Sequence, residues 1–219
     1  MGPRRTNVVV LANGTFPRRG SPAWNLLAAA RTVVACDGAA IAFQRRFGRA
    51  PDFTVGDLDS LPAHAAARFA AVRVSDQETN DLEKALDFCA ARGWSAPVVV
   101  GACGRREDHM LGNVFRALAR GITVIADFGT FHPVCGRRTF RPPVGSAVSV
   151  FAPDPATRMS SKGLAWPLDG VRFANLFCAT LNRTTSAQVT VESDRLVFVY
   201  IAFSSSHPAE DGKIPVSTR

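Results

Sequence analysis

The chain has 219 residues, of which 47% are hydrophobic and 20% are charged, which excludes a disordered chain and indicates one large globular domain or two small ones. The formal net charge is +8, but the basic residues form no arm or dense run, so we expect no nucleic-acid partner. No apolar stretch reaches the roughly 18 to 20 residues of a membrane span, and none has the length of a signal-peptide core. The five cysteines lack the spacing of a zinc site, so we expect free thiols, a cytoplasmic protein and no membrane partner.

The first part of the chain alternates short apolar runs with segments of helical spacing. The apolar runs predict buried strands at residues 7–12, 32–36, 53–55, 71–74, 97–101 and 122–126. The segments between them predict helices at residues 24–30, 39–47, 81–91 and 108–119. Strands that alternate with helices indicate an α/β domain, a mostly parallel sheet with flanking helices on both faces. We assign this domain to residues 1–128.

The pattern changes after residue 128. Strand-like runs separated by Gly and Pro occur at residues 130–134, 138–140, 147–151, 187–191 and 196–202, with no convincing helix between them. This pattern predicts a smaller all-β sandwich domain over residues 129–203. Residues 204–219 form a polar C-terminal tail.

Acidic residues follow the second and third predicted strands. Asp37 is followed by small residues that allow close approach of a ligand, and it can bind a hydroxyl or a metal-bound water; the alternative is a helix cap. In an extended segment Asp57 and Asp59 point the same way while Leu58 turns to the core. Such a pair suits Mg²⁺, which binds one or two carboxylates together with phosphate oxygens. The alternative is a capped turn that opens a helix after residues 61–62.

A third polar cluster leads into the predicted helix at residues 81–91. Thr79 is expected to cap this helix, and Asp81 and Lys84 share one of its faces. One of the two can hold a metal while the other meets a phosphate. The alternative is an ordinary capped helix with an ion pair.

The fourth cluster, residues 101–109, joins the fifth strand to a helix. Its glycines permit close backbone approach, and the guanidinium of Arg105 matches phosphate oxygens. Asp108 and His109 can position a metal or transfer protons, although a histidine in this place can also be structural.

Together the four clusters predict a Mg²⁺-polyphosphate site at the carboxyl ends of the strands. Phosphoryl transfer needs mainly positioning and charge neutralisation, which these residue types supply. The chain has no G-x-x-x-x-G-K-[ST], G-x-G-x-x-G or G-x-S-x-G motif, which argues against P-loop, dinucleotide-binding and serine-hydrolase classes.

In this order the motifs resemble those of the thiamine pyrophosphokinase family. Residues 37–40 resemble its D-G-G-A segment, and residues 56–60 its G-D-x-D-S segment. Residues 79–84 are similar to its T-D-x-x-K element, and residues 101–109 to its G-x-x-G-R-x-D-H element. Residues 163–169, Gly-Leu-Ala-Trp-Pro-Leu-Asp, resemble its G-L-x-W-P-L segment.

The resemblance implies an α/β catalytic domain, a thiamine-binding β-sandwich and a homodimer with sites at the subunit interface. It also implies transfer of the β,γ-diphosphate of ATP to the thiamine hydroxyl with release of AMP, and Mg²⁺ as cofactor. Two alternatives remain, a diphosphokinase acting on another hydroxymethyl heterocycle such as a pterin, and a non-catalytic nucleotide- or nucleic-acid-binding protein.

Carried over by position, the resemblance also implies roles for individual residues. The metal and phosphate group corresponds to Asp57, Asp59 and Asp81. ATP and phosphate contacts correspond to Asp37, Gln77, Thr79, Lys84, Arg105 and Asn113. Asp108 or His109 would orient or deprotonate the alcohol. Trp166, unless it belongs to the core, would stack on the thiamine cation. Asn182 would bind the substrate as well: residues 181–182 correspond to the family's Ser-Asn pair near the thiamine pocket, with Leu181 in place of the Ser.

Overall fold

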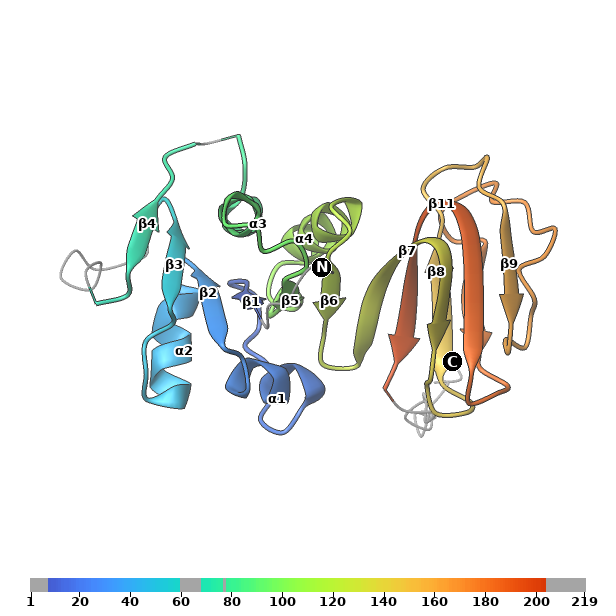
Figure 1. Cartoon of the computed structure of the whole chain (residues 1–219), viewed down its shortest axis with the longest axis horizontal. Coiled ribbons are helices and arrows are strands. Elements are labelled where there is room, and N and C mark those ends of the chain that lie inside the picture. The colour runs from blue at the N-terminus through green and yellow to red at the C-terminus, as the bar shows by residue number, and fades with distance from the viewer. Residues whose placement is uncertain (1–7, 60–67, 77, 204–219) are drawn as a thin grey trace, which may run out of the picture. The chain divides into compact units, whose positions relative to one another are not determined.

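A computed structural model describes residues 8–59, 68–76 and 78–203 of the chain (Figure 1). The chain divides into two compact units between Pro133 and Val134, a few residues beyond the boundary expected from the sequence, and each unit is described by itself. Gln77, the turn at residues 61–62 and the C-terminal tail lie outside the described residues. Among the helices that the structure describes, none is both long and apolar enough to cross a membrane.

The first unit contains a sheet flanked by helices. Its strands are β1 (Val8–Leu11), β2 (Thr32–Cys36), β3 (Phe53–Gly56), β4 (Ala71–Arg73), β5 (Val98–Val100) and β6 (Thr123–Ile125). Its helices are α1 (Pro22–Ala28), α2 (Ala39–Phe47), α3 (Asp81–Ala91) and α4 (Glu107–Ala119). The strand order is β6-β5-β1-β2-β3-β4, and every neighbouring pair in it is parallel. Since β7 (Gly129–Phe140) pairs with β6 in the antiparallel sense, the sheet is mixed.

Helices lie on both faces of this sheet, which explains why its central strand is apolar at every position. Val9 and Leu11 of β1 belong to a core cluster with residues of α1 and α2. Val8 and Val10 point to the opposite face, because side chains alternate along a strand, and both are equally buried. Helix α3 contacts β1, β2 and β3 and covers this second face (Figure 1). The sequence of a central strand that is covered on both faces is a continuous hydrophobic run, as in β1.

The order of the strands creates a switch point beside β1. The chain adds β2, β3 and β4 on one side of β1 and then returns to place β5 and β6 on the other side. In an open α/β sheet, ligands bind outside the carboxyl ends of the strands where the order reverses. The loops after β1 and β5 therefore mark the expected site.

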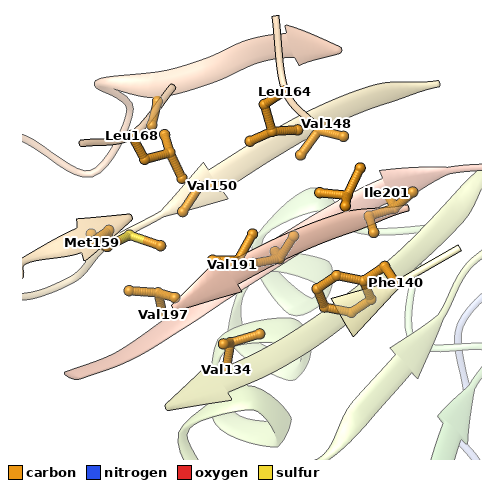
Figure 2. Packing of buried hydrophobic residues seen from close by; sticks show 14 of the residues in the cluster. Val134, Phe140, Val148, Val150, Met159, Leu164, Leu168, Val191, Val197 and Ile201 are labelled. Atoms are coloured by element: carbon orange, nitrogen blue, oxygen red, sulfur yellow. The ribbon is translucent and has the colours of Figure 1, made fainter. Parts of the chain in front are cut away.

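The second unit is built from strands. After β7 come β8 (Ala147–Phe151), β9 (Met159–Lys162), β10 (Ala179–Arg183) and β11 (Val189–Ala202). Strand β8 pairs with β10 and β11, and β9 pairs with β11, all antiparallel. Figure 2 shows that apolar side chains from these strands point toward one another, with Leu164 and Leu168 of the β9–β10 connection closing the cluster.

Several predicted elements of the second unit differ from the structure. The runs at 130–134 and 138–140 belong to one strand, β7, although Pro133 and Gly136 interrupt its pattern, and the runs at 187–191 and 196–202 both belong to β11. Strands β9 and β10 were not predicted, because polar residues interrupt their apolar pattern. The first half of β11 pairs with β9 and its second half pairs with β8, so β11 connects these strands, and the predicted sandwich stays a prediction.

Candidate functional site

A cavity of about 500 Å³ lies at the carboxyl ends of the parallel strands in the first unit. The loops after β1, β3 and β5, the last residue of β2, the segment that leads into α3, and side chains of α3 and α4 line it. Of the residues predicted from the sequence, the lining contains Asp57, Thr79, Asp81, Lys84, Arg105, His109 and Asn113. Asp37, Asp59 and Asp108 are not among the lining residues, and Gln77 lies outside the described part of the chain.

The loops after β1 and β5 lie directly against each other. The backbone N–H of Gly14 donates to the carbonyl of Gly101 at 2.8 Å, and that of Thr15 donates to the carbonyl of Cys103 at 2.8 Å. A Cβ at Gly14 would overlap the backbone carbonyl oxygens of Gly101 and Cys103, so only glycine permits this approach. The cavity is therefore bordered by two loops that are hydrogen-bonded to each other and closely packed.

Arg105 is held in place beside these loops. Its backbone has a φ of 63°, an uncommon conformation for a residue other than glycine. Its Nη1 donates to the carbonyl oxygen of Asn13 at 3.1 Å and to the Asn13 side-chain oxygen at 3.3 Å. A guanidinium has five N–H donors, so Asn13 orients the group while other donors remain to bind phosphate oxygens.

The start of α3 has a different cap from the predicted one, and it brings Asp81 and Lys84 together. Asn80, and not Thr79, is the N-cap: its side chain accepts from the Glu83 N–H at 2.9 Å, and the Glu83 carboxylate accepts from the Asn80 N–H, which is a capping box. Thr79 instead donates its hydroxyl to Asp76. The Nζ of Lys84 lies 3.6 Å from Asp81 Oδ1, and the lysine side chain is only 4% exposed.

Burial and neighbouring charges raise the pKa of Asp81. Burial is the largest cause, Asp57 and Asp37 add negative charge nearby, and Lys84 acts in the opposite direction. A Cβ at Gly56 would lie 3.0 Å from Asp37 Cβ and 3.2 Å from Asp81 Oδ1, so both acids lie beside β3. Asp37 is buried and is not the cap of α2, because the N-cap is Gly38. This corner of the cavity carries more negative than positive charge.

The segment Asp57–Leu58–Asp59 is not extended, so the extended backbone predicted for this pair is wrong. Leu58 has a φ of 68°, which turns the chain, and Asp57 Oδ1 accepts from the Asp59 N–H at 3.2 Å. The Asp59 carboxylate lies 4.0 Å from Nη2 of Arg73, and both side chains are exposed. Among the described residues, no three His, Cys, Asp or Glu side chains form a ready-made metal site.

Asp108 and His109 have different environments. Asp108 accepts two hydrogen bonds from Arg106, at 3.1 Å and 2.6 Å, which lower its pKa to about 2. His109 is exposed and lines the cavity, so it is not a core histidine. One turn further along α4, Asn113 accepts a hydrogen bond of 3.0 Å from the Asn80 side chain.

Sequence reasoning missed several lining residues, among them Asn13, Cys36, Asn80 and Arg106. The Cys36 thiol donates to the carbonyl of Asp81 at 3.5 Å, and burial, with Asp81 nearby, raises its pKa well above its usual value. Asn80 was detectable, because Glu83 stands three residues after it, as a capping box requires. Arg106 lies inside the predicted segment 101–109 but was given no role there, and Asn13 belongs to none of the four predicted clusters.

The second unit has its own cavity, of about 450 Å³, which Trp166, Leu181 and Asn182 help to line. Trp166 is 57% exposed and is therefore not a core residue. Asn182 is buried and holds the Trp166 backbone, accepting from its N–H at 3.2 Å and donating to its carbonyl at 2.7 Å. The Arg183 guanidinium lies 5.6 Å from the Trp166 ring centre. The structure thus brings the two predicted substrate residues together.

Comparison with known proteins identifies relatives over most of the chain. The family model described as thiamin pyrophosphokinase, catalytic domain, matches residues 23–125, and the model of the thiamin pyrophosphokinase substrate-binding domain matches residues 129–200. No match is found among curated proteins.

Solved structures of low sequence identity share the fold. A thiamine pyrophosphokinase from Bacillus subtilis is similar with a TM-score of 0.71 at 16% identity, covering 91% of this chain and 100% of that one. One from Geobacillus thermodenitrificans gives a TM-score of 0.69 at 21% identity, covering 91% and 98% of the two chains. The yeast enzyme gives 0.72 at 11% identity, covering 90% and 86%.

Proposed function

The chain belongs to the thiamin pyrophosphokinase family, and we propose that the cavity of its first unit binds ATP for transfer of a diphosphate to thiamine. The protein is accordingly an enzyme, a thiamine diphosphokinase. The observation that supports this use of the cavity is its combination of a buried lysine, an anchored arginine and two helix N-termini at the switch point of the sheet.

We assign the ATP phosphates to the basic side of this cavity. Lys84 is a positive charge of fixed position, because its side chain is buried and extends toward Asp81. Arg105 adds a planar donor group held by Asn13. Both charges act where the negative charge of the transferring diphosphate develops, and preorganised charges of this kind are among the largest contributions to catalysis.

The acidic corner fits a Mg²⁺ ion that arrives with ATP. Burial is the largest cause of the raised pKa of Asp81, and Asp57 and Asp37 add to it; a divalent cation between these carboxylates would favour their charged forms. Mg²⁺ needs only one or two protein carboxylates when phosphate oxygens complete its ligands. Asp57 and Asp81 would hold it, and Asp59 would join them, since its exposed ion pair with Arg73 is weak and costs little to break. The ion would shield charge on the phosphates.

His109 is the group we assign to the alcohol proton. The thiamine oxygen forms a bond to the β-phosphorus, the bond from that phosphorus to the oxygen of the α-phosphate breaks, and AMP leaves. The hydroxyl proton passes to His109, which lines the cavity. Asp108 is unsuited to this step, because its two hydrogen bonds to Arg106 keep it ionised with a pKa of about 2.

Thiamine is assigned to the cavity of the second unit. The exposed Trp166 ring offers a face for the thiazolium cation, and the bonds from Asn182 fix the backbone that carries it. From family membership we further propose a homodimer with sites at the subunit interface. The exposed side chains of Phe177 and Leu181 are consistent with such a contact. We also propose a cytoplasmic location, which the free thiols of all five cysteines support.

Lys84→Met tests the assignment of ATP to the cavity of the first unit. Methionine keeps most of the buried side chain and removes the charge, so we expect kcat/KM for ATP to fall by about 100-fold or more, with cooperative unfolding retained. Lys162→Met is the matched control, because Lys162 is exposed on β9, and it should leave turnover unchanged. Wild-type ATP kinetics in a folded Lys84→Met variant would reject the assignment.

A further inference from the structure

One carboxylate links the two helices that begin at the ATP cavity. Glu83 closes the capping box at the start of α3 by accepting from the Asn80 N–H. The same carboxylate forms ion pairs with Arg116 of α4 and with Arg120, the C-cap residue of α4, the second at 3.5 Å. Its side chain is only 13% exposed, and Glu83 is not among the residues that line the cavity.

A second contact joins the same two helices at the cavity itself. The Asn80 side chain accepts from the Glu83 N–H and donates to Asn113 of α4 at 3.0 Å. Asn80 therefore bonds both helices, and its orientation depends on the capping box that Glu83 completes. Helices α3 and α4 are neighbours (Figure 1), and the Asn80 bond joins the start of α3 to the middle of α4, while the ion pairs join it to the C-terminal end of α4.

The functional side chains lie on both sides of this junction. Asp81 and Lys84 come from the first turn of α3, and His109 and Asn113 come from α4. A shift of α3 relative to α4 would change the distance between the groups that meet the phosphates and the group that meets the alcohol. Misplacement of reacting groups by about 1 Å costs on the order of 100-fold in rate.

We propose that Glu83 is a positioning residue for ATP: by bonding the start of α3 and two arginines at the C-terminal end of α4 at once, it sets the spacing of the ATP cavity. This inference rests on the proposed function, because it takes the cavity to be the ATP site. Because Glu83 does not line the cavity, it acts through Asn80, Asp81 and Lys84, which do.

The test compares Glu83→Ala and Glu83→Gln in the full chain. Loss of the carboxylate in Glu83→Ala should raise KM for ATP about tenfold, with KM for thiamine within twofold of wild type. Glutamine keeps an oxygen that can accept from the Asn80 N–H but loses the charge that holds the arginines. Glu83→Gln should therefore recover part of the ATP affinity. Equilibrium titration with Mg-ATP provides a second readout that does not depend on turnover.

Two controls separate positioning from general loss of stability. Asp87→Ala removes another α3 partner of Arg120, but Asp87 has no part in the cap, so ATP affinity should stay within twofold of wild type. Leu27→Ala opens a cavity in the core under α1 and should lower Tm at least as much as Glu83→Ala without changing ATP affinity.

The inference is overturned if folded Glu83→Ala binds and uses ATP within twofold of wild type. It is equally overturned if Leu27→Ala weakens ATP binding as much, or if KM for thiamine rises in parallel. If the wild-type chain binds Mg-ATP but forms no AMP with thiamine, the proposed function fails, while the ATP titrations of the variants still decide the role of Glu83.

Discussion

Asp108 is predicted to remain ionised throughout the working pH range of the enzyme. Its pKa is lowered to about 2 by the Arg106 hydrogen bonds, so its stabilising contribution is present above the unfolded pKa near 4 and is lost only as pH falls toward 2. Asp108→Asn should therefore leave the pH dependence of kcat/KM unchanged in shape between pH 5 and 9. The measurement is a pH–rate profile of both proteins, and a shift of the acidic limb in the variant would make Asp108 the titrating base.

Leu181 adopts a backbone conformation that leucine rarely takes. Its φ is 64°, it lies where the register of β10 and β8 shifts, and its side chain is 84% exposed. A left-handed conformation costs a residue with a Cβ about 1 to 2 kcal/mol, and the exposed side chain recovers little of this by packing. Strain of this kind clusters at binding sites, and Leu181 lines the cavity assigned to thiamine.

Leu181→Gly should therefore stabilise the protein by about 0.5 to 1 kcal/mol, after the added freedom of glycine in the unfolded chain is counted. Leu181→Ala is the matched control, since it removes the side chain beyond the Cβ but keeps the Cβ, and it should change stability by less than about 0.5 kcal/mol. Urea unfolding of the variants measures both values. Equal effects of Gly and Ala would show that the backbone of Leu181 is not strained.

Most of the residues that line the cavity could be predicted from the sequence, but the directions in which their side chains point could not. Asp57, Asp81 and Arg105 each belong to a polar segment close after a predicted strand, and parallel strands bring their carboxyl ends to one edge. The turn at Leu58 was not predictable, because its positive φ is uncommon for leucine and has no local signal. Asp59 consequently faces Arg73, where an extended chain would have aimed it beside Asp57.

Replacing a glycine with alanine should have opposite effects on the stability of the protein in a loop and in a helix of the first unit. Gly14→Ala places a Cβ against two backbone carbonyls of the loop after β5, so one loop must move. We expect a loss of about 1 to 3 kcal/mol in stability together with weaker ATP binding. Gly112→Ala, in α4, meets open space and should stabilise the protein by about 0.5 to 1 kcal/mol.

Thermal or urea unfolding with Mg-ATP titration checks both glycine variants. If Gly14→Ala binds ATP as tightly as wild type, the packing of the two loops is not needed for the site. Both variants add the same methyl group, so a difference between them in stability or ATP affinity comes from the surroundings of Gly14 and Gly112.

Elements of the first unit were easier to predict than those of the second, for a physical reason. Strands such as β1 and β2 are covered on both faces and show uninterrupted apolar runs, and α2 ends at Gly48, whose φ is 69°. Strand β9, Met-Ser-Ser-Lys, buries little besides Met159, so no periodicity marks it. Pro133 and Gly136 suggested a break in β7, but the pairing of a strand depends on neighbours that a local pattern does not contain.

For the whole molecule, we propose that a phosphate-binding α/β unit and a second unit with an exposed tryptophan serve one reaction. The family assignment supports the reaction, and the proposed ATP, Mg²⁺ and thiamine contacts rest on the two cavities. The choice of AMP as the leaving group follows from attack at the β-phosphorus and distinguishes this enzyme from one that transfers a single phosphate.

The most direct test measures the nucleotide released from ATP and Mg²⁺ with and without thiamine, with the second product identified by mass. We expect AMP to appear only with thiamine, in amounts equal to the thiamine diphosphate formed. Release of ADP with thiamine monophosphate, or no thiamine product at all, would contradict it.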